Sequence, residues 1–267
     1  MNGQFNEIFT QLESWYCSER GKYLLERARG VLQPRLDTAF GYHILQLGPV
    51  RGVSLLEGSP INPHIHAGSR PGEGVDLVCD GDELPLESDS VDVVVAHHCL
   101  EFHSNPHQVL REIQRVLTPQ GQLLLLGFNP FSLRGINTRC RGFLRRSPWH
   151  GHSPVSEPRL RDWLHLLGCE VHHSAYLYTV PPAGGSRLRR VLERCDSWCS
   201  AHNIPLGGIY VVHAVKQVAA QNRPRLDLRS RSQRLIGLAA PSPAPTAPTR
   251  NPGVAAANRK STGDVAA

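Results

Sequence analysis

The amino-acid sequence predicts an α/β domain, a doubly wound, mostly parallel Rossmann-like sheet flanked by helices, with an antiparallel last strand. Short apolar, β-branched runs alternate along the chain with amphipathic helical patterns, which is typical of this class. Residues 91–96 are almost continuously apolar, as expected of a strand buried on both faces. A helical pattern over residues 105–117 separates this run from another at 122–128, and that spacing indicates a parallel crossover.

The remaining elements follow from the same two periodicities. Further strands are expected at residues 44–48, 64–68, 170–178 and 209–215. Two helices are expected within residues 5–36, one at 156–168 and a basic one at 186–201. In the helix at 105–117, Asn105 is the expected N-cap and Pro106 the first helical residue, and the Pro119-Gln120-Gly121 segment is expected to stop it.

Composition changes character at about residue 220. We expect one domain over residues 1–219, with a helical N-terminal extension (1–40), a core (40–130) and a substrate-side half (129–219). Residues 220–267 are Arg-rich and then Pro/Ala-rich, so they are expected to form a disordered tail. The tail carries seven Arg, one Lys and two Asp, which accounts for the whole formal net charge of +6. The body is neutral but polarised, because acidic residues dominate before residue 120 and basic ones after it.

The cellular context is expected to be cytoplasmic. No stretch approaches the ~20 consecutive apolar residues that a membrane span needs, and the first residues lack the basic-then-apolar pattern of a signal peptide. The 7 cysteines are odd in number and show no paired spacing, which argues against a disulfide framework. The pattern Cys195, Cys199, His202 is one ligand short of a zinc site, so no metal site is expected.

A glycine-containing turn follows the first expected strand. Gly48 and Gly52 lie four residues apart in the segment Gln46-Leu47-Gly48-Pro49-Val50-Arg51-Gly52. Such glycines permit a tight turn that opens a helix and a close approach of the backbone to a ligand, although a purely structural turn explains them equally well. Ligands of doubly wound sheets bind where strands end, so the residues after each strand are the candidate site.

Two longer blocks carry a family resemblance over residues 40–130. Residues 80–95 read DGDELPLESDSVDVVV, and residues 110–121 read LREIQRVLTPQG. In this order and spacing they resemble the class I S-adenosylmethionine-dependent methyltransferases, in the small-molecule branch (methyltransferase type 11) that includes quinone- and biotin-pathway enzymes. The resemblance implies an enzyme that uses S-adenosyl-L-methionine to methylate a small-molecule or lipid-like acceptor.

The resemblance also implies roles for individual residues. Gly48 and Gly52 would form the turn under the methionine and ribose parts of the cofactor. Asp80 and Gly81 would contact the adenine, and Ala96 and a neutral His97 would line the floor near the sulfonium. Alternatively, Asp80 belongs to a solvated acidic loop, and the two histidines at 97 and 98 are interior residues with satisfied hydrogen bonds.

The chain departs from the family pattern at positions where carboxylates are expected. Gln46 replaces an acid in the first strand, and Val50 replaces a glycine. Ser69 or Arg70 stands where an acid would grip the ribose hydroxyls. Neutral groups such as Gln46 and Ser69 would then hold the ribose. The alternative is a catalytically inactive, methyltransferase-like binding or regulatory protein that acts through its basic half and tail.

Catalysis and acceptor recognition are expected on the same side of the sheet. His98 is the candidate general base, because it follows a strand and has a suitable pKa class. The segment after residue 128 combines arginines with Phe143 and Trp149, and a second arginine cluster spans residues 187–194. This is either a solvated basic face or a recognition surface for an anionic partner, meaning an acidic small molecule, an anionic lipid surface or RNA. The tail would add a weak, salt-sensitive contact with RNA or an anionic membrane.

Overall fold

The computed structural model describes one compact unit within residues 1–219. The described residues are 2–132, 154–177, 190–191, 194, 196–199, 202, 204–205 and 207–217. The expected tail (220–267), most of the expected basic helix and the arginines between residues 134 and 146 therefore lie outside the described residues. Among the described residues, no helix combines the length and the apolar character that crossing a membrane requires.

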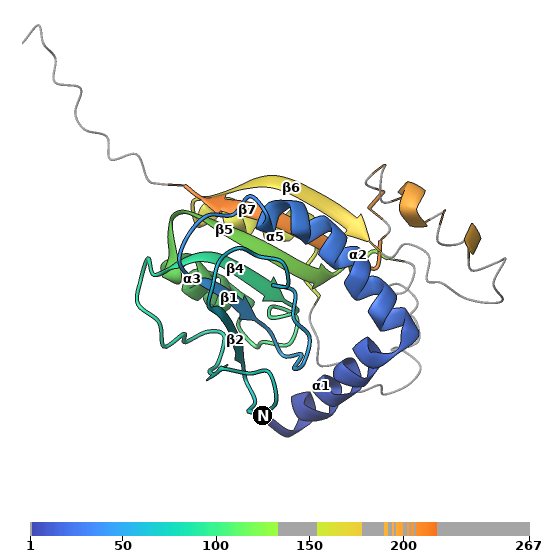
Figure 1. Ribbon diagram of the computed structural model, residues 1–267, viewed down its shortest axis with the longest axis horizontal. Coiled ribbons are helices and arrows are strands. Elements are labelled where there is room, and N and C mark those ends of the chain that lie inside the picture. The colour runs from blue at the N-terminus through green and yellow to red at the C-terminus, as the bar shows by residue number, and fades with distance from the viewer. Residues whose placement is uncertain are drawn as a thin grey trace, which may run out of the picture. The chain divides into compact units, whose positions relative to one another are not determined.

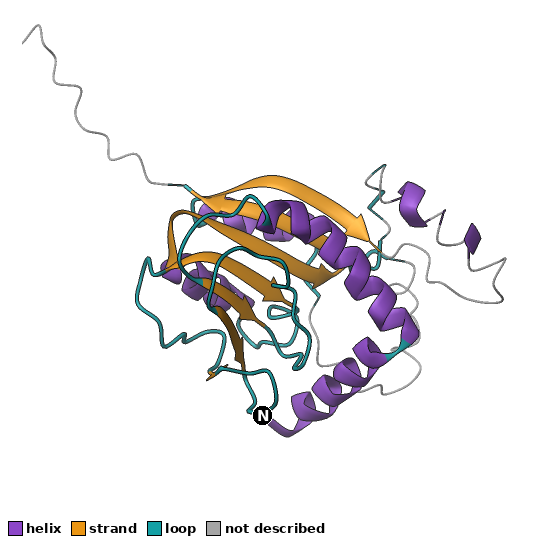
Figure 2. Cartoon of the chain, in the orientation of Figure 1, coloured by secondary structure: helices purple, strands orange, loops and turns teal. Residues whose placement is uncertain are grey.

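A seven-stranded sheet forms the centre of the unit, with the order β3-β2-β1-β4-β5-β7-β6 (Figures 1 and 2). Its strands are β1 (Ile44–Leu47), β2 (His64–Gly68), β3 (Leu77–Val78), β4 (Val91–His97), β5 (Leu117–Phe128), β6 (Cys169–Leu177) and β7 (Ile209–Lys216). All neighbours pair in parallel except β7, which is antiparallel to both β5 and β6. The expected fold class, with its antiparallel last strand, is confirmed.

Helices cover both faces of the sheet (Figure 2). They are α1 (Asn2–Cys17), α2 (Glu19–Leu36), α3 (Pro106–Val116) and α5 (Glu157–Leu166). Alternate residues of β4 point to opposite faces, so Val93 and Val95 pack in the core with α1 and α2, whereas Val94 and Ala96 pack with α3 and α5. The α1–α2 pair confirms the two helices expected within residues 5–36.

The glycine turn does not open a helix, and this expectation was wrong. No helix occurs between residues 48 and 63, although the doubly wound pattern predicts one there. Pro49, Pro60 and Pro63 interrupt this segment, and each lacks the N–H that a helix interior requires. The N-terminal helices α1 and α2 cover this face instead, and that arrangement brings α1 to the carboxyl ends of the strands.

The boundary between α3 and β5 also differs from the expectation. The helix ends at Val116 and the strand begins at Leu117, so the strand passes through the segment that was expected to be only a stop. The pairing register with β4 shifts between Val91 and Val93, because Leu117 pairs with Val91 and Gln122 pairs with Val93. Pro119 cannot donate to a ladder, and such positions are typical of bulges.

Candidate active site

Helix α1 lies over the carboxyl ends of β1, β2 and β4. Phe9, Glu13 and Tyr16 follow one another at helical spacing and share one face of α1. Glu13 contacts the segments that follow β1 and β2, and Tyr16 contacts the end of β4. The order of the strands reverses between β1 and β4, and such switch points are where doubly wound sheets bind ligands.

A buried chain of polar side chains links α1 to the end of β4. The Tyr16 hydroxyl lies 2.7 Å from Nε2 of His98, and Nδ1 of His98 lies 3.3 Å from Oε1 of Glu101. The same Glu101 oxygen accepts a hydrogen bond of 2.6 Å from the backbone N–H of Phe128. The ring of Phe128 stacks on that of His98, with 4.0 Å between the ring centroids. The imidazole of His98 is therefore fixed in position by an acid, a phenol and an aromatic ring.

His97 shares the Tyr16 hydroxyl with His98. Its Nε2 lies 3.1 Å from that hydroxyl, and its Nδ1 has no hydrogen-bond partner within the described part of the chain. Burial, with a smaller contribution from the charge of His98, holds the pKa of His97 well below the usual value of 6.5. His97 is therefore neutral at physiological pH.

The backbone at His98 is in the left-handed region, with a φ of +54°. Its N–H donates to the carbonyl of Leu126 in β5, at 3.0 Å. Non-glycine residues rarely adopt this conformation, and when they do they cluster at functional sites. In this conformation the His98 side chain contacts the Tyr16 hydroxyl.

A second polar cluster fixes α1 to the ends of β1 and β2. Oε1 of Glu13 accepts hydrogen bonds from Nε of Arg51 at 2.8 Å and from a terminal nitrogen of Arg70 at 3.0 Å. Its Oε2 accepts from the other end of the Arg51 guanidinium at 3.0 Å. The guanidinium of Arg70 also lies over the ring of Phe9, 5.0 Å from its centroid.

These ion pairs perturb the pKa of Glu13. Burial alone would raise the pKa of this carboxyl. Hydrogen bonds from Arg51 and the charges of Arg70 and Arg51 outweigh burial, so the pKa is lowered below the usual 4.5. Glu13 is thus a carboxylate at neutral pH and is held in place by two cations.

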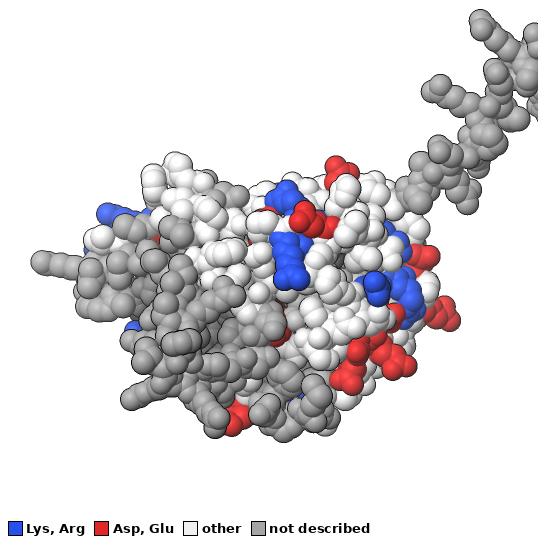
Figure 3. All heavy atoms as spheres, turned by 180° about the vertical axis from the view of Figure 1, so that it is seen from behind, with Lys and Arg blue, Asp and Glu red and all other residues white. Residues whose placement is uncertain are grey.

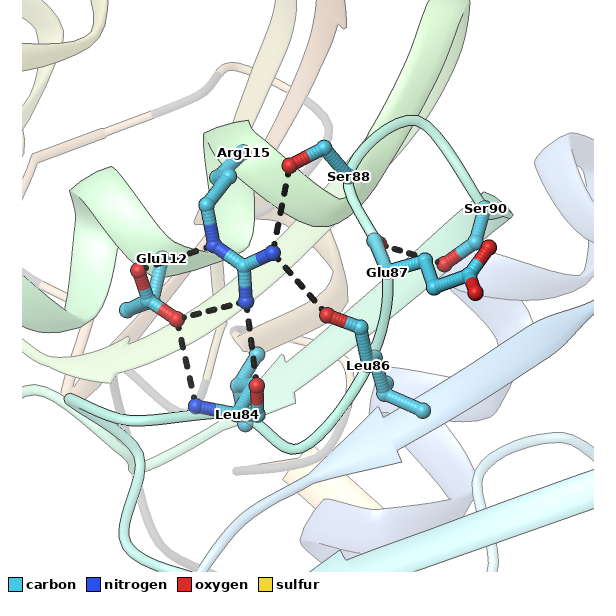
Figure 4. Close-up of polar contacts among 7 residues, drawn as sticks. All are labelled: Leu84, Leu86, Glu87, Ser88, Ser90, Glu112 and Arg115. Carbon is cyan, nitrogen blue, oxygen red and sulfur yellow. Dashed lines mark hydrogen bonds and ion pairs between the residues drawn. The ribbon is translucent and has the colours of Figure 1, made fainter.

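The segment that carries the expected adenine contacts is braced from α3 (Figure 4). Arg115 donates to the carbonyls of Leu84 and Leu86 at 3.0 and 2.9 Å, and to the Glu112 carboxylate at 2.8 Å. Oε2 of Glu112 in turn accepts the backbone N–H of Leu84 at 3.1 Å. The Glu and Arg of the second sequence block therefore hold the loop of the first block.

Asp80 and Gly81 lie at the start of this braced loop. The Asp80 side chain is exposed, and a Cβ at Gly81 would lie 3.9 Å from Cδ2 of Leu47 and 3.5 Å from a methyl group of Val109. Gly81 therefore lies between the end of β1 and the start of α3. The exposed Asp80 thus directly precedes a residue that packs near Leu47, the last residue of β1.

Comparisons with known proteins agree with this geometry. Residues 62–125, which run from β2 into β5, match the family model described as a methyltransferase domain. The chain has the fold of a class I S-adenosylmethionine-dependent methyltransferase. A methyltransferase of this kind from Thermotoga maritima, described as a possible histamine N-methyltransferase, superimposes with a TM-score of 0.58 at 15% identity, over 81% of this chain and 100% of that chain.

Two sequence relatives extend the comparison. The uncharacterized protein YafS of Escherichia coli K12 is 28% identical over 225 residues, which cover 80% of this chain and 88% of that protein. A demethylmenaquinone methyltransferase of Chlamydia pneumoniae is 32% identical over 87 residues, which cover 32% of this chain and 38% of that enzyme. The similarity to YafS therefore extends beyond residues 62–125, which the family model matches. The similarity to the demethylmenaquinone methyltransferase covers only part of this chain.

The two glycines of the turn after β1 have different surroundings. A Cβ at Gly48 would collide with the carbonyl oxygen of His97, so this glycine is required by the close approach of β1 and β4. Gly52 has a φ of +66°, where glycine is favoured, and a Cβ there would meet nothing within 4 Å. Gly48 thus has a structural role, and Gly52 leaves open space above the turn.

The two neutral residues expected at the ribose occupy different environments. Gln46 is buried, its Nε2 donates to the carbonyl of Val53 at 2.6 Å, and its Oε1 accepts from the N–H of Leu55 at 2.7 Å. Its amide is therefore engaged in holding the segment after the glycine turn. Ser69, in contrast, is exposed just beyond β2.

Sequence reasoning missed the contributions of α1. Glu13, Tyr16 and Glu101 were not predicted as site residues, and Arg51 and Arg70 were noted only as members of the turn and strand-end segments. The helical spacing of Glu13 and Tyr16 shows that they share a face, but nothing local indicates which part of the sheet this face covers.

On the described part of the rear face, acidic and basic side chains intermingle and form no extended patch of one sign (Figure 3).

Proposed function

We propose that this protein transfers a methyl group from S-adenosyl-L-methionine to a small-molecule or lipid-like acceptor. The arginine-rich segment after residue 128 favours an anionic acceptor. The observation that carries the proposal is the juxtaposition, at one edge of a methyltransferase fold, of the exposed Asp80 with its half-buried neighbour Gly81, the glycine turn and the neutral His97. A neutral imidazole there can lie beside a sulfonium cation without repelling it. We further propose a cytoplasmic domain over residues 1–219 with a separate tail over 220–267.

The residues of this edge fit the cofactor in several respects. Asp80 and Gly81 would hold the adenine, and Gly48 and Gly52 would form the turn beneath the methionine and ribose parts. Ala96 and His97 would form the floor, and the unpartnered Nδ1 of His97 is a buried polar atom that a bound ligand can satisfy. At the ribose, Ser69 is free to contribute, whereas Gln46 would act through the backbone segment that it holds. When bound, the cofactor supplies an already activated methyl group.

The role proposed for His98 is that of a general base acting through Tyr16. Because Glu101 faces Nδ1, that nitrogen carries the proton, and Nε2 is left as the acceptor that faces the Tyr16 hydroxyl. An acceptor hydroxyl or acidic carbon would pass its proton to the Tyr16 oxygen while the Tyr16 proton moves to His98. Glu101 would stabilise the resulting imidazolium.

Calorimetric titration with S-adenosylhomocysteine tests the cofactor assignment directly. We expect micromolar binding by the full chain and about 10- to 100-fold weaker binding by Asp80→Asn, since the loss of one charge-assisted hydrogen bond corresponds to roughly 1.5–3 kcal/mol. Asp162→Asn, an exposed aspartate of α5, makes the same charge change away from the strand ends and should bind as the wild type does. Binding no tighter than millimolar by a folded wild-type chain would contradict the proposal.

One set of observations favours a second candidate, a catalytically inactive binding or regulatory protein. Gln46 is engaged by the backbone, and Glu13 of α1 is already paired with Arg51 and Arg70, so neither side chain is free to hold the ribose hydroxyls. This candidate predicts that Asp80→Ala leaves biological activity intact and that charge reversal at Arg145 and Arg146, which lie outside the described residues, abolishes it. The opposite pattern would support the enzyme.

The tail has its own proposed role, a weak contact with RNA or an anionic membrane. Its composition and its net positive charge support this role. Deleting residues 220–267 should leave the melting temperature nearly unchanged and remove salt-sensitive binding to anionic vesicles or RNA. Unchanged binding after the deletion would contradict it.

A further inference from the structure

Glu13 receives more hydrogen-bond donors than a single surface ion pair provides. Its Oε1 lies 3.3 Å from the backbone nitrogen of Arg51, 2.8 Å from Nε of Arg51 and 3.0 Å from a terminal nitrogen of Arg70. Its Oε2 lies 3.0 Å from the second Arg51 nitrogen. One carboxylate is thus surrounded by a main-chain amide and two guanidinium groups, which is the donor set that proteins use for bound carboxylates.

These donors come from the ends of two neighbouring strands. Arg51 belongs to the glycine turn after β1, and Arg70 follows β2 by two residues. Arg51 is also anchored independently of α1, because it donates to the carbonyl of Pro71 at 3.0 Å. Two guanidinium groups converge on one carboxylate here, at the edge where such sheets bind ligands. Glu13 alone comes from a separate element, the helix that covers this edge.

We propose that Arg51 and Arg70 form a binding site for a small-molecule carboxylate, and that Glu13 of α1 occupies this site until the ligand displaces it. Glu13 is tethered to the site by the chain and therefore competes at an effective concentration in the millimolar range. Binding of an external carboxylate is weakened by the fraction of time that Glu13 occupies the arginines. The helix then moves as a consequence of ligand binding, since the contact that holds Glu13 is the contact that the ligand takes.

The chemistry of the site limits the ligand. The paired donors of a guanidinium match the two oxygens of a carboxylate. A carboxylate at this edge can belong to the amino-acid part of the cofactor or to the methyl acceptor. The choice between these two sources rests on the proposed function, whereas the existence of the site does not.

The first experiment uses glutarate as the probe, because its carboxylate matches that of a glutamate side chain. We expect Glu13→Gln and Glu13→Ala to bind glutarate about tenfold more tightly than the wild type, by calorimetry, because the tethered competitor is gone. Adding Arg70→Gln should abolish the gain. Glu57→Gln is the matched control, since it removes an exposed pair with Arg29 of 3.0 Å, and it should show no gain.

A measurement on the wild-type chain keeps the test independent of how well the variants fold. Saturating glutarate should speed amide hydrogen exchange in α1, because Glu13 loses its partners, and should leave exchange in α5 unchanged. If the folded Glu13 variants show no gain in glutarate affinity and α1 shows no faster exchange, the cluster is a permanent structural ion pair. These two results together would overturn the proposal.

A second pair of probes identifies the source of the carboxylate. S-adenosylhomocysteine carries the amino-acid group, and 5′-methylthioadenosine keeps the adenosine and the thioether but lacks it. If the cofactor is the source, Glu13→Gln should strengthen binding of the first compound about tenfold and leave the second unchanged. If the acceptor is the source, Glu13→Gln should strengthen the binding of glutarate alone and leave the binding of both nucleosides unchanged. Wild-type protein that binds glutarate but neither nucleoside would contradict the proposed methyl transfer and leave the carboxylate site standing.

Discussion

The hydroxyl of Tyr16 in α1 lies 2.7 Å from Nε2 of His98 and 3.1 Å from Nε2 of His97. A phenol has one proton, so it donates to one imidazole and accepts from the other. Because Nδ1 of His98 faces the Glu101 carboxylate, the consistent arrangement has Tyr16 donating to His98 and His97 donating to Tyr16. One side chain of α1 thus satisfies two buried histidines at the end of β4.

Replacing Tyr16 by Phe should destabilise the protein by about 1–3 kcal/mol, because two buried nitrogens lose their shared partner while the ring packing is kept. Urea unfolding of the full chain measures this change. Tyr42→Phe is the matched control, since the Tyr42 side chain is 76% exposed, and its free energy of unfolding should stay within about 0.5 kcal/mol of wild type. Equal effects of the two substitutions would mean that the Tyr16 hydroxyl stabilises nothing.

The Arg115 brace is expected to affect both stability and ligand binding. Arg115→Gln removes the donors to two loop carbonyls and to Glu112, so we expect a loss of about 1–3 kcal/mol in the free energy of unfolding. The loop that carries Asp80 should then bind S-adenosylhomocysteine more weakly, by calorimetry. Arg111→Gln, an exposed arginine of the same helix, is the control and should change neither quantity. A destabilised Arg115→Gln with unchanged affinity would separate the brace from the ligand site.

Local patterns predicted most of the fold because the elements obey periodicity. The strand expected at 64–68 is β2 at the same bounds, and the helix with its Asn105 cap is α3. The cap is formed, since the Asn105 side chain accepts from the N–H of Gln108. The helix expected after the glycine turn is the exception, because the fold-level pattern outweighed the prolines that forbid it.

The polar contacts of the site could not be predicted because their partners are distant in sequence. Tyr16 and His98 are 82 residues apart, and Glu13 and Arg51 are 38 residues apart. Their contacts depend on where α1 packs, and apolar periodicity says only that α1 has a buried face. The sequence shows that β1 and the end of β2 lack the acids of the family pattern. Only the structure shows that the carboxylate of Glu13 lies at the ends of these strands.

Lys216 at the end of β7 stabilises the junction between α3 and β5. Its Nζ donates to the carbonyls of Gln114 and Leu117, at 2.8 and 2.6 Å, and pairs with the Asp89 carboxylate at 2.6 Å. A cation at a helix C-terminus is favourable, and here its side chain is only 13% exposed. Lys216→Met should therefore lower the free energy of unfolding by about 1–3 kcal/mol. Lys22→Met, an exposed lysine of α2, should cost less than about 0.5 kcal/mol, and a comparable loss there would contradict the assignment.

The stability of the protein should fall as the pH drops from 7 to 5, and His213 in β7 should cause part of this fall. Burial first, then the charges of Arg35, His172 and His173, lower the pKa of His213 from 6.5 to about 4. Its Nε2 lies 3.1 Å from Oε1 of Gln122, a contact that suits the neutral ring. Between these two pKa values the unfolded chain binds a proton that the folded chain excludes, so unfolding becomes easier as the pH falls through this window.

The substitution His213→Gln should reduce the loss of unfolding free energy between pH 7 and 5 by about 1–2 kcal/mol, because one of the protons that drive it is removed. A smaller slope should remain, since the pKa values of His66, His97 and His173 are also lowered by burial. Urea titrations at several pH values measure the slope, with His165→Gln, an exposed histidine of α5, as the control. If the slope of His213→Gln equals that of the wild type, His213 takes up its proton in the folded state as readily as in the unfolded one, and its burial is not coupled to stability.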